Sequence, residues 1–245
     1  MMKKKILLSL LMSFMLLFTG LATAQEDSAL QLGAKAFQNE EYQSAVEHLV
    51  EAVANNDDSK QGHYLLGLSY YRLGKYEFAQ TQLEKAHQID QDDYKVLVNL
   101  GRTYYQLDKY QEAMNMANEA MKNNYGKPDA YALLGRVHNA RGKLKVAIRN
   151  FKQAVKIDGD NYYYLNYLGY LYLKKGEYKE GIPHLEKAAE ANPKAAYIFN
   201  NLGLCYENTG QLKKAKEAYQ KAIEINSNYT NAKVNLNRVT SKQVE

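Results

Sequence analysis

The 245-residue sequence has no tryptophan, and Cys205 is its single cysteine. One cysteine excludes a disulfide within the chain, so the folded state must be held by its core. The formal net charge is +5, and it falls to +2 when the three lysines of the N-terminal start, Lys3–Lys5, are set aside. The basic character is therefore mostly N-terminal. It gives no support to nucleic-acid binding, which needs a concentrated basic stripe.

Long hydrophobic runs are scarce, and the clearest one lies at the N-terminus. Met1–Lys5 is a short cationic start, Ile6–Phe18 is an unbroken run of apolar and small residues, and Ala22–Ala24 offers small residues where a signal peptidase reads. This pattern predicts a signal peptide over residues 1–24 and an exported protein, periplasmic or secreted. An uncleaved membrane anchor is the less favoured alternative, because the run is short for a span.

Recognisable catalytic and metal-binding patterns are also missing. The five histidines have no partner at metal-ligand spacing. Cys205 falls in a predicted helix, where a buried, unreactive thiol is the expectation. No glycine-rich phosphate loop stands apart from the repeats described next. The sequence therefore predicts no catalytic residue, no metal site and no cofactor, and a protein that is not an enzyme.

Glycine recurs at one fixed spacing of 34 residues. The six positions are Gly33, Gly67, Gly101, Gly135, Gly169 and Gly203. A large apolar or aromatic residue follows each glycine by 9 residues, a tiny residue by 12 and alanine by 19. This period is typical of a helix–turn–helix unit, so the sequence predicts an all-α solenoid in which each unit buries its face on its neighbours.

The position seven residues after each repeat glycine predicts the turn between the two helices. Glycine stands there in four units, and Glu40 and Asp108 stand there in the other two. Clusters of Asp and Asn between the units are expected to cap the next helix. In the fifth unit Pro183 predicts a local irregularity of the second helix, since proline lacks an N–H and crowds the preceding turn.

These columns resemble the tetratricopeptide repeat: leucine precedes each repeat glycine, as in Leu66–Gly67, and an aromatic residue follows four of them by three residues, as in Tyr70. The resemblance covers residues 26–229 and implies a right-handed superhelix of stacked antiparallel helix pairs. A capping helix is expected within 230–245, and the mature domain should begin at Gln25. The six predicted units are 26–59, 60–93, 94–127, 128–161, 162–195 and 196–229.

The resemblance also implies that the first helices of the units line a concave groove that binds a partner. Its predicted residues are Tyr64, Leu68, Tyr71, Val98, Arg102, Tyr105, Arg136, Asn139, Asn166, Tyr170 and Asn200. Arg102 and Arg136 could hold a carboxylate, while Asn166 and Asn200 could bond the backbone of an extended peptide. Glu207, at the far end, is expected to disfavour an acidic group there.

We therefore expect a non-enzymatic protein–protein interaction scaffold of the cell envelope, whose partner segment is acidic near its middle. By analogy, exported repeat proteins of this kind serve assembly of outer-membrane, pilus or secretion machinery. The alternative is a ligand-binding or enzyme-tethering module for cell-wall oligosaccharide or peptidoglycan enzymes, which would depend on Tyr64, Tyr71 and Tyr105. Neither nucleic acid nor stable membrane insertion after signal cleavage is expected.

Overall fold

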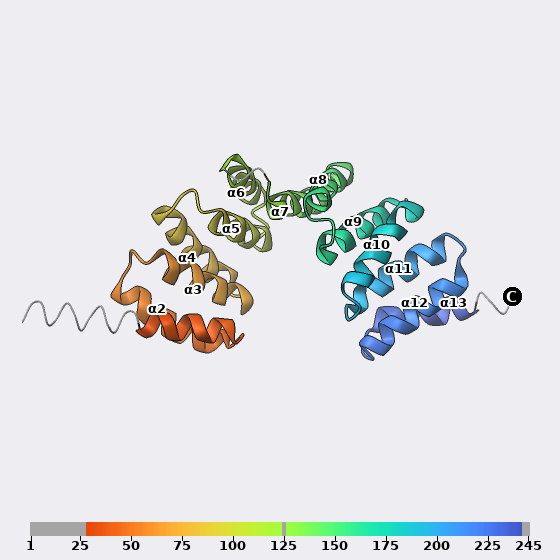
Figure 1. Ribbon diagram of the computed structural model, residues 1–245, viewed down its shortest axis with the longest axis horizontal. Coiled ribbons are helices and arrows are strands. Elements are labelled where there is room, and N and C mark those ends of the chain that lie inside the picture. The colour runs from red at the N-terminus through yellow and green to blue at the C-terminus, as the bar shows by residue number, and fades with distance from the viewer. Residues whose placement is uncertain (1–27, 124–125, 242–245) are drawn as a thin grey trace, which may run out of the picture. The chain divides into compact units, whose positions relative to one another are not determined.

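The structure is a computed structural model that describes residues 28–123 and 126–241. Thirteen α-helices and no strand occur in these residues, as the sequence predicts (Figure 1). The first helix covers residues 28–38. The others are α2 Tyr42–Asn55, α3 Lys60–Arg72, α4 Tyr76–Ile89, α5 Tyr94–Gln106, α6 Tyr110–Asn123, α7 Pro128–Ala140, α8 Leu144–Ile157, α9 Tyr162–Lys175, α10 Tyr178–Ala191, α11 Ala196–Asn208, α12 Leu212–Ile225 and α13 Thr230–Ser241. The predicted signal peptide lies outside the described residues.

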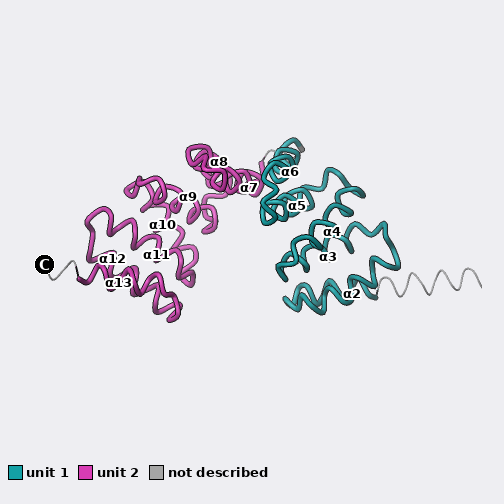
Figure 2. Tube along the Cα trace, turned by 180° about the vertical axis from the view of Figure 1, so that it is seen from behind, with its two compact units in different colours: residues 1–123 teal, residues 124–245 magenta. Residues whose placement is uncertain are grey.

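The chain divides into two compact units, residues 1–123 and 124–245 (Figure 2). The division falls inside the third predicted repeat, 94–127, at the end of α6. Within the units the helices pack in consecutive pairs: α3 with α4, α5 with α6, α7 with α8, α9 with α10, and α11 with α12. First helices of successive pairs also touch, α3 with α5, α9 with α11, and α11 with α13. This consecutive packing confirms an all-α solenoid.

Close contact between the two helices of a pair explains the glycine column. A Cβ added at Gly135 would lie 2.5 Å from Cδ2 of Phe151, and one at Gly169 would lie 2.5 Å from Cγ of Leu185. In both cases the contact residue follows the glycine by 16 positions, a column that the sequence analysis did not single out. Glycine is thus required because a large core side chain of the second helix occupies the space of its missing side chain.

The turn column is left-handed in all six units. The four glycines there have φ between 73° and 83°, and Glu40 and Asp108 have φ of 62° and 56°. Positive φ is costly for residues with a side chain, so these two positions hold strained backbone where the other units use glycine.

Pro183 does not interrupt α10, and the local irregularity predicted there is slight. The helix runs unbroken over Tyr178–Ala191 and has 14 residues, like the other second helices. The only difference we find is at its start, where Gly181 N donates to Glu177 O at 3.2 Å, against 2.9–3.0 Å at the equivalent position of the other pairs. Pro183 is the sixth residue of α10 and cannot donate to the carbonyl four residues before it, yet the helix continues across it.

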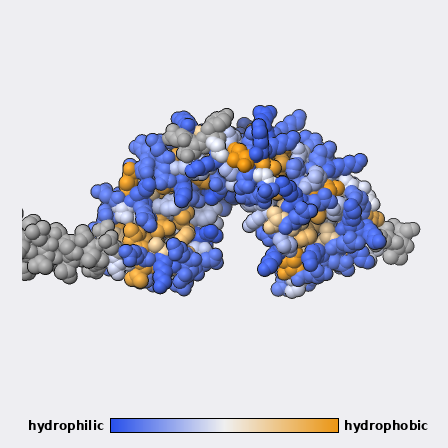
Figure 3. Space-filling view, in the orientation of Figure 1, coloured by the Kyte–Doolittle hydropathy of each residue, from blue (hydrophilic) through white to orange (hydrophobic). Residues whose placement is uncertain are grey.

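Adjacent repeats are joined by the aromatic column three residues after the glycine. Tyr104 Oη donates to Glu84 Oε1 at 2.7 Å, and Tyr206 Oη donates to Glu186 Oε1 at 2.5 Å. Helix α13 repeats the pattern of a first helix, but Asn237 takes the place of the glycine and is exposed. A second helix could not approach Asn237 as closely as it approaches a glycine, which is in line with a capping role; that role stays a prediction. Figure 3 shows a mostly hydrophilic surface on the visible face of each unit.

Candidate interaction surface on the first helices

The predicted groove residues all lie on first helices, and we call them the first-helix face. Unit 1 holds those on α3 and α5, and unit 2 holds those on α7, α9 and α11. Arg102 therefore belongs to unit 1 and Arg136 to unit 2, and each is described within its own unit. The prediction that the two arginines act on one stretch of a partner stays a prediction.

Hydrogen bonds with a fixed sequence separation of 35 residues join neighbouring first helices. In unit 1, Asn99 Nδ2 donates to Tyr64 Oη at 3.0 Å, and Gln106 Nε2 donates to Tyr71 Oη at 3.1 Å. Unit 2 has four more, which are Tyr164 to Asp129, Lys174 to Asn139, Asn201 to Asn166 and Asn235 to Asn200. These bonds fix the polar side chains of the face before any partner arrives, which lowers the entropy lost on binding.

Arg102 lies among tyrosines in unit 1. Its Nη1 donates to Asn99 Oδ1 at 3.3 Å, and Asn99 in turn bonds Tyr64. Burial raises the pKa of Tyr64 and Asp93 adds to the rise, whereas the bond from Asn99 and the charge of Arg102 oppose it. The guanidinium is thus close enough to act on the Tyr64 hydroxyl, and it is half-buried beside aromatic surface.

The two asparagines predicted to grip a peptide backbone are buried in unit 2. Asn166 is 8% exposed and Asn200 is 5% exposed. The Oδ1 atom of each accepts a bond from the next first helix, at 3.2 Å from Asn201 and at 2.9 Å from Asn235. These amides therefore connect neighbouring repeats, and their role toward a partner stays a prediction.

Glu207 differs from its expectation. It is 9% exposed, and its two carboxylate oxygens accept from Arg238 Nε at 2.9 Å and Arg238 Nη2 at 2.7 Å. Tyr219 Oη also donates to it at 2.9 Å. The expectation that Glu207 disfavours an acidic group is therefore wrong, because its charge is neutralised by a bidentate ion pair. Arg238 stands 34 residues after Leu204, in the same column as Arg102 and Arg136, and the sequence analysis missed it.

Three half-buried tyrosines lie on one side of α9. Tyr163, Tyr167 and Tyr170 are spaced i, i+4 and i+7, with ring centroids 5.8 and 5.9 Å apart in sequence order. Tyr167 also stacks on Phe151 at 4.5 Å. Of these, only Tyr170 belonged to the predicted face. The helical spacing could have revealed the other two, but tyrosine is so frequent in this chain that the pattern did not stand out.

Outside the first-helix face, the described residues form no reactive or metal-binding group. Cys205 is fully buried, and burial raises the pKa of its thiol to about 12, so it is held as an unreactive thiol. In the described part of the chain, no group of three His, Cys, Asp or Glu side chains could hold a metal ion. None of the described helices is long and apolar enough to span a membrane.

Family models match the chain over most of its repeats. Three models described as tetratricopeptide repeat match residues 58–125, 162–194 and 196–229, and one described as TPR repeat matches residues 135–176. No curated protein sequence matches the chain. The family matches agree with the predicted spacing of 34 residues.

Solved structures give the same fold at low sequence identity. The APC/C hetero-tetramer Cut9–Hcn1 contains a chain 17% identical, with a TM-score of 0.79 over 87% of this chain and 42% of that one. Pseudomonas aeruginosa pilF is 17% identical, with a TM-score of 0.74 over 90% of this chain and 99% of that one. YrrB, a TPR protein with an unusual peptide-binding site, is 22% identical, with a TM-score of 0.55 over 76% of this chain and 96% of that one. These structures share the fold, and the family models, which together match more than half of the chain, establish that the chain belongs to the tetratricopeptide-repeat family.

Proposed function

We propose that the protein is a non-enzymatic interaction scaffold of the cell envelope whose first-helix face binds an acidic segment of a partner protein. The repeat family and its structural neighbours support the scaffold role. YrrB, which has a similar fold, has an unusual peptide-binding site, in line with a peptide-like partner here. The signal-like N-terminus supports the envelope location.

The observation that carries the acidic partner is the Glu207–Arg238 pair. Arg238 holds, with two hydrogen bonds, a carboxylate presented by the preceding first helix. Arg102 occupies the same column of the repeat, and Tyr71 occupies the place that corresponds to Glu207. A carboxylate from a partner could therefore reach Arg102 in the way that Glu207 reaches Arg238, while tyrosine supplies apolar contact area.

A pull-down with crosslinking from the native envelope would recover the partner, and its affinity for variants would test the site. Arg102→Ala should weaken binding about tenfold, because a hydrogen bond between charged groups is lost. It should also reduce the salt dependence of binding. Lys122→Ala, an exposed lysine of α6, is the matched control and should change binding less than twofold.

The role assigned to Arg136 needs its own variant, because Arg136 lies in unit 2. If both arginines contact one acidic segment, Arg102→Ala/Arg136→Ala should lose more affinity than either single variant, with an unchanged helical circular dichroism signal. Unchanged affinity of the double variant would contradict the acidic-segment proposal. Binding of cell-wall oligosaccharide that is lost on replacing Tyr64 and Tyr71 by alanine would instead favour the ligand-binding alternative.

A further inference from the structure

Helix α8 carries an exposed row of four cations, Lys145, Arg149, Lys152 and Lys156. At about 100° per residue the four positions fall within about 60° around the helix, and they extend about 16 Å along it. The side chains therefore form one narrow row, nearly parallel to the helix axis. We call them the α8 row. The four cations do not form a continuous basic run in the sequence, and the net charge of the chain is small. For these two reasons the sequence analysis did not recognise the row.

The other second helices do not repeat this feature. Each of α2, α4, α6, α10 and α12 contains at least two glutamates, whereas α8 contains neither Asp nor Glu. Nor does the protein neutralise the row itself. Within the described residues no ion pair engages any of its members. Lys152 instead contacts an aromatic ring, with its Nζ 5.7 Å from the centroid of Tyr172.

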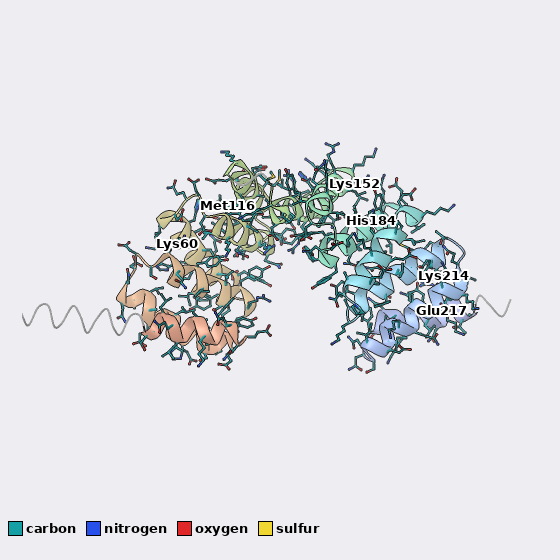
Figure 4. All side chains as sticks on the ribbon, viewed as in Figure 1. Lys60, Met116, Lys152, His184, Lys214 and Glu217 are labelled. Atoms are coloured by element: carbon teal, nitrogen blue, oxygen red, sulfur yellow. The ribbon has the colours of Figure 1, made fainter. Side chains whose placement is uncertain are left out.

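Charged groups on and beside α10 lie near the row. Asp160, after α8, pairs with Lys187 of α10 at 3.0 Å, and Glu177 at the start of α10 acts electrostatically on Lys152. Burial lowers the pKa of His184 on α10, and the charge of the nearby Lys152 lowers it further (Figure 4). Asp160 and Glu177 are each paired with another lysine, Lys187 and Lys175, so neither carboxylate is left to neutralise the row.

The apolar face of α8 is not available for insertion into lipid. Ala147, Phe151 and Ala154 are fully buried, and Ile148 is 7% exposed. A helix that binds in a membrane interface needs its apolar face for that purpose. The row is therefore an electrostatic surface with a defined spacing and no apolar anchor.

From this geometry we infer that the α8 row is a second interaction surface, separate from the first-helix face, and that it binds a helical segment of a partner protein with carboxylates spaced i, i+4, i+7 and i+11. Acidic side chains at that spacing form an equally narrow row on their helix, so four ion pairs can form without bending either chain. The exposed location predicts modest affinity with strong dependence on salt.

The test uses an alanine-based helical peptide with glutamates at i, i+4, i+7 and i+11, and an isomer with its four glutamates consecutive. Binding to the full chain is measured by fluorescence anisotropy at low and moderate salt. Lys145→Gln/Arg149→Gln/Lys156→Gln should bind the aligned peptide about tenfold more weakly, because three exposed ion pairs are lost. Lys152 is kept because it contacts Tyr172.

The matched control removes the same charge from α12, as Lys213→Gln/Lys216→Gln/Lys221→Gln, and should change binding less than twofold. Arg102→Ala should also leave it unchanged, which separates this surface from the proposed function. Equal binding of both peptides, an unaffected α8 variant, or no binding by the parent would overturn the inference. So would a preference of the row for phosphatidylglycerol vesicles or an oligothymidylate over the aligned peptide.

Discussion

The guanidinium of Arg238 on α13 holds the buried carboxylate of Glu207 on α11 through two hydrogen bonds, of 2.9 and 2.7 Å. The side chain of Glu207 is 5% exposed, whereas that of Arg238 is 44% exposed. The pair therefore fastens the last helix to the body of unit 2. Tyr219 adds a third bond to the same carboxylate.

Removing only the charge of Arg238 should destabilise the fold more than removing the charges of both Arg238 and Glu207. We expect Arg238→Gln to lower the free energy of unfolding by about 2 kcal/mol, because it leaves a buried carboxylate without its counter-charge. Glu207→Gln/Arg238→Gln should lose less than Arg238→Gln. Urea unfolding of the two single variants and the double variant gives the coupling energy, and strictly additive losses would contradict this account.

Gly135→Val should destabilise unit 2 by about 1–3 kcal/mol, because its side chain would collide with the Phe151 ring. Phe151 is fully buried and stacked on Tyr167, so it has little room to move. Thermal unfolding measures the loss. Ala140→Val, at an exposed place on the same helix, is the control, and an equal melting temperature for both variants would refute the prediction.

Glu40→Gly should stabilise unit 1 by about 0.5–1 kcal/mol, since glycine accepts the positive φ of 62° at no steric cost. The adjacent Glu41 has φ of −82°, so Glu41→Gly should bring no gain. The midpoints of urea unfolding should therefore move in opposite directions, or only the first should rise. Equal effects of the two variants would show that backbone strain is not the cause.

Stability should fall as the pH drops below about 6.5, where histidine titrates in an unfolded chain. Burial and the charge of Lys152 lower the pKa of His184, and burial together with Lys143 and Arg141 lowers that of His138. The unfolded chain then binds more protons than the folded one, so acid favours unfolding in this window. Melting temperatures between pH 7.5 and 5.5 should fall less in His138→Gln/His184→Gln than in the parent; equal falls would exclude this mechanism.

The sequence predicted the helix pairs well because their causes are local and repeated. Gly135 needs space at one spot in every unit, and Gly74 needs a left-handed backbone, so both leave a column with a fixed period. For Pro183 the sequence shows the missing N–H, but it does not show whether the helix continues across it.

The candidate site was harder to predict, because a polar side chain on a first helix can face either a partner or the next repeat. Asn166 and Asn200 are predicted to bind a partner. In the structure they instead accept hydrogen bonds from Asn201 and Asn235, which follow them by 35 residues in the sequence. Glu207 was read as an exposed charge because its counter-ion, Arg238, lies in the predicted cap. The sequence shows which residues occupy the face, but only the packing shows which of them the fold has already used.

The amide pairs of unit 2 also bear on how such a chain can change in length. Asn166 and Asn200 meet identical partners, so loss of residues 196–229 by recombination would bring Asn166 to Asn235 and preserve the joint. The same event would delete Glu207 and leave Arg238 facing the apolar Leu173. Interior repeats can thus be exchanged at the amide contact, whereas the terminal helix is matched to the repeat before it and should be inherited together with it.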